Sequence, residues 1–149
     1  MYNKKILIRK ANQFDFGDIL KWRNDKTSRK MSFNPKIITP QMHKLWFFEV
    51  LSNNNKVIYI GELDNYKVGV CRFDFDKLRL VSEVSINMNP HLRGKGLGKL
   101  FLKSSIVKYI RNNKNNIVAQ VRSDNLASIK IFTHSGFEII QDKDNKIYF

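Results

Sequence analysis

A glycine-rich, basic segment between an expected strand and an expected helix constrains this chain more than any other feature. Residues 84–88 read as a strand that stops before Pro90. Gly94, Gly96 and Gly98 then lead into an apolar pattern with helical spacing. Glycines let successive backbone N–H groups converge on an anion, and the helix that follows adds the positive end of its dipole. The segment predicts a phosphate-binding loop, best suited to a pyrophosphate; an ordinary flexible turn is the alternative interpretation.

Two better-known phosphate loops do not fit the segment. A P-loop closes on Gly-Lys-Ser or Gly-Lys-Thr, whereas Leu100 follows Gly98 and Lys99 here. A dinucleotide-binding fingerprint follows the first strand and has an acidic residue about 20 positions later. Residues 114–116 of this chain are Lys-Asn-Asn at that place. The segment therefore belongs to neither of these two classes of phosphate-binding loop.

Length and residue content indicate one α/β domain over residues 1–149. The chain has 149 residues, of which 42% are hydrophobic, enough to bury a core. Cys71 is its one cysteine, which excludes an internal disulfide and a cysteine-based zinc site. His43, His91 and His134 lie apart, so no metal site is expected. No apolar run is long enough for a membrane span or a signal peptide, and we expect a cytoplasmic protein with no membrane partner.

The net charge of +14 favours an anionic partner or serves solubility. Between residues 90 and 130 there are nine lysines and arginines and one acid, Asp124, so the charge is densest around the glycine loop. A nucleotide-bearing cofactor or substrate would gain from this field, and so would nucleic acid. Charge alone does not choose among these partners.

Periodicity and turn residues predict a β-α-α-β-β-β-α-β-α-β-β order. Thr39 and Pro40 form a strong helix start, a cap followed by a first-turn proline. A loop is expected over residues 28–35. The expected strands are 6–8, 56–60, 67–73, 78–88 and 117–121 with a closing hairpin of 137–140 and 146–149, and the expected helices are 14–22, 40–51, one after the glycine loop, and 126–134.

The sequence Arg93-x-x-Gly96-x-Gly98 resembles motif A of the GNAT acetyltransferases, and the order of elements is also the GNAT order. The resemblance implies a mixed, mostly antiparallel central sheet of six to seven strands flanked by about four helices. It also implies acetyl-coenzyme A as the acetyl donor. A homodimer is compatible with this expectation.

A second stretch is similar to the last helix and turn of the same family. It reads Asn125-x-x-Ser128-x-x-x-Phe132, followed by Gly136 and Phe137. In the family the asparagine holds the pantetheine arm, although a helix N-cap is an equally good interpretation of Asn125. The cofactor-binding residues expected from both motifs are Ile86, Met88, Arg93, Gly94, Lys95, Gly96, Leu97, Gly98, Lys99, Asn125, Ser128 and Phe132.

The resemblance also places the catalytic groups. Glu83 lies where many GNAT enzymes have a general base, and the amide of Met88 is expected to stabilise the oxyanion. A surface carboxylate in a sheet is the plain alternative for Glu83. Many family members have a tyrosine acid at the position of Phe132, which has no proton to donate, so His134 and Ser135 are the nearby candidates for an acid acting through water.

The sequence reads Trp22-Arg23-Asn24 at the end of the first expected helix, then Ser32-Phe33-Asn34, and His43-x-x-Trp46-Phe47 in the second helix. This combination resembles GNAT enzymes of the pseudaminic-acid type of pathway, which implies that the acceptor is the amino group of a nucleotide-linked (UDP-) amino sugar. Arginines suit a diphosphate, and aromatic rings suit a uracil or a sugar face. Alternatives are a protein N-terminus or a small amine, and, in another class, a non-enzymatic nucleic-acid-binding domain; no nucleic acid is expected for the enzyme. The aromatic residues also suit a plain core role. The expected substrate-binding residues are Trp22, Arg23, Asn24, Arg29, Asn34, His43 and Trp46.

Overall fold

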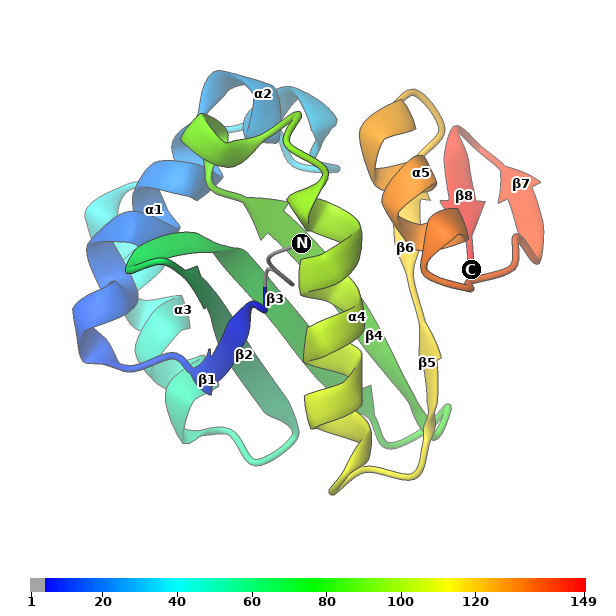
Figure 1. The fold of residues 1–149 in the computed structure, drawn as a ribbon, viewed down its shortest axis with the longest axis horizontal. Coiled ribbons are helices and arrows are strands. Elements are labelled where there is room, and N and C mark those ends of the chain that lie inside the picture. The colour runs from blue at the N-terminus through cyan, green and yellow to red at the C-terminus, as the bar shows by residue number, and fades with distance from the viewer. Residues whose placement is uncertain (1–4) are drawn as a thin grey trace.

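The computed structural model describes residues 5–149, and its strands form two sheets (Figure 1). A five-stranded sheet has the order β1-β2-β3-β4-β5, and a three-stranded sheet has the order β6-β8-β7. In chain order the elements are β1 (Leu7–Lys10), a 3-10 helix (Gln13–Asp15), α1 (Phe16–Asn24), α2 (Lys26–Met31), α3 (Pro40–Ser52), β2 (Lys56–Leu63), β3 (Tyr66–Asp76), β4 (Val81–Met88), a 3-10 helix (Pro90–Leu92), α4 (Leu97–Ile110), β5 (Asn116–Val118), β6 (Gln120–Arg122), α5 (Leu126–His134), β7 (Gln141–Lys143) and β8 (Lys146–Tyr148).

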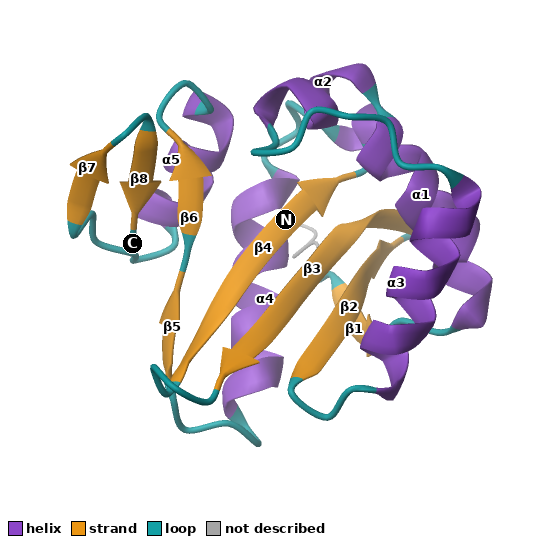
Figure 2. Cartoon of the chain, turned by 180° about the vertical axis from the view of Figure 1, so that it is seen from behind, coloured by secondary structure: helices purple, strands orange, loops and turns teal. Residues whose placement is uncertain are grey.

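The two sheets separate because β5 pairs with β4 over only a few residues, after which the chain turns away from β4. Neighbouring strands are antiparallel except β4 and β5, which are parallel and pair only from Val81–Asn116 to Glu83–Val118. After Ala119 the chain continues as β6, which pairs with β8 instead. Figure 2 shows β6, β7 and β8 standing apart from β4 while β5 still meets its lower end. This divergence opens the cleft described below.

The five-stranded sheet buries both faces. Alternation along β2 directs Ile58 and Ile60 into a cluster with Trp22 of α1 and Phe47 of α3. The opposite face, whose buried residues include Phe73, packs against α4. Figures 1 and 2 show α4 on one side of the sheet and α1 and α3 on the other. The helices therefore hold the sheet rigidly on both sides.

Several expected elements are confirmed at their boundaries. Thr39 caps α3 by accepting the Met42 amide, and Pro40 is its first residue. The helix at 126–134 is α5. The mixed α/β class and the mostly antiparallel central sheet are also confirmed, although the central sheet has five strands rather than six or seven. Residues 5–149 hold five α-helices rather than about four.

Three local predictions are wrong. The expected loop at 28–35 begins instead with the end of α2, because Asp25 caps that short helix by accepting the Ser28 amide at 3.1 Å. The strand expected at 117–121 is interrupted at Ala119, whose amide and carbonyl bond to Phe149 instead. The closing hairpin uses 141–143 rather than 137–140 for its first strand.

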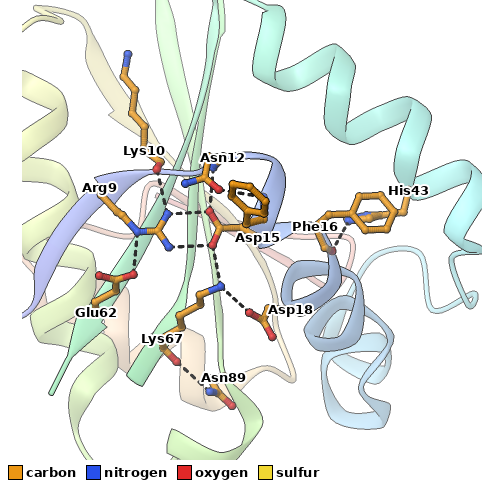
Figure 3. Close-up of polar contacts among 11 residues, drawn as sticks. Arg9, Lys10, Asn12, Asp15, Phe16, Asp18, His43, Glu62, Lys67 and Asn89 are labelled. Carbon is orange, nitrogen blue, oxygen red and sulfur yellow. Dashed lines mark hydrogen bonds and ion pairs between the residues drawn. The ribbon is translucent and has the colours of Figure 1, made fainter. Parts of the chain in front are cut away.

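A buried carboxylate fixes the start of α1 to the sheet (Figure 3). The side chain of Asp15 is fully buried and accepts two hydrogen bonds from Arg9 of β1, at 2.8 and 2.9 Å. Lys67 of β3 lies 2.9 Å from the same carboxylate. Burial alone would raise the pKa of Asp15, but hydrogen bonds from Arg9, the Asn12 amide and Lys67 lower it to about 2. Asp15 is therefore a buried anion that joins the start of α1 to β1 and β3.

Candidate active site

A large cleft lies where β4 and β6 diverge. Its volume is about 1070 Å3, and it is lined by residues from α1, α2, α3, β3, β4, the glycine loop, α4, β6 and α5. Phe33, in the connection between α2 and α3, has the Lys146 ammonium of β8 over its ring, 4.9 Å from the centroid. This connection therefore reaches across the cleft to the second sheet.

Strand β4 offers unpaired backbone groups to the cleft. The Asn89 amide, directly after β4, donates to the Val68 carbonyl of β3 at 2.8 Å. In an antiparallel pair, the amides of successive residues point alternately toward the neighbouring strand and away from it. The amides of Ile86 and Met88 consequently point away from β3, toward the side on which β4 has lost its neighbour β5. Both residues line the cleft. A ligand lying along β4 can hydrogen-bond to these groups as an additional strand would.

The glycine loop has the backbone conformation of an anion-binding turn. Gly94 and Gly96 both have φ of +72°, a left-handed conformation that other residues rarely adopt. Gly96 is the N-terminal flanking residue of α4, and no side chain caps that helix, so its first amides have no side-chain partner. Gly98 faces α5, where an added Cβ would lie 2.4 Å from Ile131. The loop thus presents amides and the positive end of a 14-residue helix.

Most residues expected to bind the cofactor line this cleft. Lys95 is exposed and does not line it. Asn125 has the alternative role as well: it caps α5 by accepting the Ser128 amide at 3.2 Å. The cofactor-side residues on the cleft wall are Ile86, Met88, Arg93, Gly94, Gly96, Leu97, Gly98, Lys99, Asn125, Ser128 and Phe132.

The Arg93 side chain is already occupied by protein groups. Its guanidinium donates to Asp25 Oδ2 at 2.7 Å and to Ser28 Oγ at 2.6 Å. Burial alone would raise the pKa of Asp25, but the hydrogen bonds from Arg93 and the Ser28 amide lower it. The Arg93 charge is thus neutralised by Asp25, and the expectation that this side chain adds free positive charge for a phosphate does not match the geometry.

Glu83 stands at the point where the strands part. It is the last residue of β4 to pair with β5, and it lines the cleft. Gln120 of β6 donates to the Glu83 carboxylate at 3.3 Å, across the opening. Phe132 is 2% exposed and packs edge-on against Phe137, so it contributes a wall and no proton. His134 is exposed and lines the cleft, whereas Ser135 does not line it.

Three of the expected acceptor-side residues line the cleft: Arg23, His43 and Trp46. Arg23 Nη2 donates to the Asn34 carbonyl at 2.6 Å, while its Nη1 is buried without a partner. Burial and the charge of Arg29 lower the pKa of Arg23. His43 is 2% exposed, and its Nε2 lies 3.1 Å from the Phe16 carbonyl (Figure 3).

The other four expected acceptor-side residues do not line this cleft, each for a structural reason. Trp22 is 4% exposed in the core between α1 and the sheet, the plain alternative for this ring. Asn24 bonds both the amide and the carbonyl of Ile38. Arg29 donates to the carbonyls of Asn24 and Pro35, and Asn34 accepts the Lys36 amide. Asn24, Arg29 and Asn34 thus stabilise the conformation of the connection between α2 and α3.

Arg72 and Gln120 line the cleft but were not predicted from the sequence. The Arg72 guanidinium lies 5.5 Å from the Trp46 ring centroid, and its Nε lies 2.9 Å from Asp74 Oδ2. The available signal was a charged residue in the middle of the otherwise apolar stretch Val68–Phe73 of β3. Gln120 offered no signal, because its role depends on the separation of β6 from β4.

Within residues 5–149, no group of three histidine, cysteine, aspartate or glutamate side chains is placed to hold a metal ion. No helix in the same range is both long and apolar enough to cross a bilayer. The signal-peptide expectation concerns residues 1–9, of which 1–4 lie outside the described residues.

Solved structures share this architecture. A domain from Methanocaldococcus jannaschii superposes with a TM-score of 0.81 and 25% identity, covering 98% of this chain and 97% of that chain. Spermidine N-acetyltransferase from Vibrio cholerae, solved with CoA and spermine, has a TM-score of 0.83 at 13% identity and covers 97% and 92%. Campylobacter jejuni N-acetyltransferase PseH, solved with acetyl coenzyme A, has a TM-score of 0.72 at 19% identity and covers 96% and 95%. The last two likenesses show the fold.

Sequence comparison carries the family assignment. L-methionine sulfoximine/L-methionine sulfone acetyltransferase of Salmonella typhimurium is 29% identical over 101 residues, which is 65% of this chain and 59% of that relative's length. The family model described as "Acetyltransferase (GNAT) domain" matches residues 5–138. This match covers most of the chain, including the glycine loop, β4 and α5, and it shows that the chain belongs to the GNAT acetyltransferase family.

Proposed function

We propose that this chain transfers an acetyl group from acetyl-coenzyme A to a primary amine, and that the amine belongs to a nucleotide-linked amino sugar. The observation that carries the proposal is one cleft with a glycine loop at one end, unpaired β4 amides along its side, and Glu83 at the point where the strands part. Two of the solved structures named above, those from Vibrio cholerae and Campylobacter jejuni, contain CoA or acetyl-CoA. The cleft thus suits an elongated thioester beside an amine.

The cofactor would bind with its pyrophosphate at the loop and its arm along β4. Amides from residue 93 to 99 and the N-terminus of α4 supply hydrogen bonds and partial positive charge without requiring a particular side chain. Lys99, exposed on the first turn of α4, adds a full positive charge. The arm then extends past Met88 toward Ile86, with the Asn125 side chain on the facing wall.

The spacing along β4 favours Ile86 over Met88 as the oxyanion donor. Extended residues rise by about 3.3 Å each, so Glu83 and Met88 lie about 16 Å apart along the strand. One carbonyl cannot be close to both groups. The amide of Ile86 lies only about 10 Å along the strand from Glu83, a separation that a glutamate side chain, a water and an amine can span. Met88 would then bind the pantetheine arm.

The chemical step is addition followed by elimination. The neutral amine attacks the thioester carbonyl carbon, and the Ile86 amide stabilises the oxyanion that forms. Glu83, held by Gln120, accepts the proton released from the nitrogen, directly or through a water. The carbonyl re-forms as the carbon–sulfur bond breaks. An alkyl thiol has a pKa of about 8.5, so the thiolate can leave without a strong acid, which agrees with a phenylalanine at position 132.

The acceptor end of the cleft favours an anionic amine. Arg23 and Arg72 both line it, and Arg23 Nη1 is buried without a partner. Trp46 and the partly exposed Phe33 offer ring faces to a base or a sugar. A diphosphate linked to a sugar and a base matches this combination of charge and rings. A polyamine does not, because two arginines at the acceptor end would repel it.

A small amino acid is the second candidate acceptor. The observation in its favour is the 29% identical relative, whose name describes acetyl transfer to L-methionine sulfoximine and L-methionine sulfone. Such a substrate carries one carboxylate beside its amine, and a single arginine would suffice to bind it. A protein N-terminus is a third option, raised by a ribosomal-protein acetyltransferase among the structural neighbours.

Release of coenzyme A against a panel of amines tests the proposal. The panel contains UDP-linked amino sugars, methionine sulfone, ribosomal-protein N-terminal peptides and spermidine, each with acetyl-CoA. Turnover of the UDP-amino sugars with the highest kcat/KM supports the proposal, and turnover of only the other amines overturns the acceptor. No turnover together with salt-sensitive retention of RNA or DNA would favour a nucleic-acid-binding domain instead.

A further inference from the structure

A chain of polar contacts joins α2 to the glycine loop and to β4. Arg93, at the start of the loop, donates to Asp25 at 2.7 Å and to Ser28 at 2.6 Å. Ser28 Oγ in turn donates to Asn87 Oδ1 of β4 at 2.9 Å. The partners of Arg93 are 68 and 65 residues away in sequence. Figure 1 shows α2 beside the segment that leads from β4 into α4.

The loop has little else to hold its shape. Gly94 and Gly96 have no neighbouring atoms within 4 Å of where a Cβ would lie, and Lys95 is exposed. Glycines with positive φ are also the most flexible residues of a chain. The part-buried Arg93 side chain therefore ties the glycine part of the loop to α2, while Leu92 directly before it packs against the core.

We propose that Arg93 is a positioning residue that binds Asp25 and Ser28 rather than the pyrophosphate, so that α2 sets the affinity of the loop for acetyl-CoA. A loop already held in its binding conformation loses less conformational entropy when the ligand arrives. Ser28 and Thr27 of α2 also line the cleft. Binding of an acceptor to α2 and binding of acetyl-CoA to the loop are consequently coupled. Each ligand raises the affinity of the chain for the other ligand.

This inference rests on the proposed binding of acetyl-CoA at the loop, and calorimetry with acetyl-CoA tests the two separately. Asp25→Asn is the informative variant, because asparagine caps a helix as well as aspartate and has the same size, so α2 keeps its cap and only the charge is lost. We expect its Kd for acetyl-CoA to rise about fivefold, which corresponds to about 1 kcal/mol. Arg93→Gln should have a similar effect. Asp25→Asn introduced into the Arg93→Gln variant should not raise the Kd for acetyl-CoA any further.

Glu49→Gln is the matched control. It removes an ion pair with Lys56, at 3.2 Å, and neither residue lines the cleft, so it should leave the Kd unchanged. Hydrogen exchange of the 93–98 amides without ligand gives a second readout: it should be faster in Asp25→Asn and unchanged in Glu49→Gln. An unchanged Kd in Asp25→Asn, or additive losses in the double variant, overturns the inference, since additive losses mean that Arg93 grips the phosphate itself. Absence of binding by the unmodified chain overturns the proposed function instead.

Discussion

The guanidinium carbon of Arg72 lies 5.5 Å from the centroid of the Trp46 ring, so a charge from the middle of β3 and an aromatic ring from α3 form one wall of the cleft. Cation–π contact and the nearby Asp74 carboxylate hold the arginine in place. An arginine fixed in this way presents its remaining N–H groups to an anion without having to become ordered first.

Replacing Arg72 should weaken acceptor binding selectively. For Arg72→Gln we expect the KM of an anionic acceptor to rise about tenfold, as for one lost charge-assisted hydrogen bond, with little change in the KM of acetyl-CoA. Steady-state kinetics with each substrate varied in turn measures both values. Arg79→Gln, in the exposed turn before β4, is the control and should change neither KM. An equal rise in both KM values for Arg72→Gln would contradict a role in acceptor recognition.

Glu83→Gln should lower the rate most where the amine is protonated. A general base contributes about 100-fold or more, so kcat/KM near pH 7 should fall by about that factor. The deficit should shrink as the pH approaches the pKa of the amine, because the neutral amine then forms without help. A pH–rate profile from pH 6 to 9.5 makes the comparison, with the exposed Glu138→Gln as its control. Parallel profiles for Glu83→Gln and the unmodified enzyme would remove Glu83 as the base.

Gly96→Ala should impair the loop, whereas Gly17→Ala should not. Gly96 has φ of +72°, and a side chain there costs about 1 to 2 kcal/mol of strain. Relief of that strain distorts the amides, so we expect about tenfold weaker acetyl-CoA binding, equivalent to about 1.4 kcal/mol. Gly17 lies in α1 with no atom within 4 Å of its Cβ position, and alanine there should stabilise the fold by about 0.5 kcal/mol. Denaturant melts give the stability of each variant, and titrations give its affinity for acetyl-CoA. Equal affinities in Gly96→Ala and Gly17→Ala would contradict a binding role for the loop.

Asp15 should make folding stability depend on pH in the acid range. Its pKa falls from 3.8 to about 2 in the folded chain, so its contribution is present above about pH 5 and is lost as the pH drops toward 2. Asp15→Asn should cost about 2 to 3 kcal/mol at neutral pH, because Arg9 and Lys67 lose their buried partner and keep only Glu62 and Asp18. Urea melts between pH 2 and 7 measure both effects. The variant should show a flatter stability profile in the acid range, and an equally steep one would rule out Asp15 as the cause.

Local signals in the sequence were sufficient for elements that depend on neighbouring residues. The Thr39 and Pro40 start located α3, and the spacing of glycines located the loop before α4, because capping and positive φ are decided within a few residues. The boundaries of α5 were predictable for the same reason, with Asn125 as its cap.

Contacts between distant segments were not predictable in the same way. The division of the strand expected at 117–121 depends on Ala119 pairing with Phe149, which is 30 residues later and directly follows β8, the neighbour of β6. The partner of Arg93 is Asp25, 68 residues earlier, so motif spacing could place the arginine in the loop but could not show that its charge is already neutralised. Trp22 was expected to bind the substrate from the resemblance of Trp22-Arg23-Asn24 to other acetyltransferases. An amphipathic helix carries core and surface aromatics alike, and only the packing of α1 against the sheet places this ring in the core.

Amide NMR of the uniformly labelled chain during titration with acetyl-CoA tests the central claim most directly. We expect saturable shifts that are largest for the amides of residues 93–99, with further shifts at Ile86 and Met88 on β4. The amides of Arg9, Asp15 and Lys67, none of which lines the cleft, should move little. Absence of saturable shifts, or shifts gathered away from the loop and β4, would contradict the claim that this bend binds the pyrophosphate of an acetyl donor.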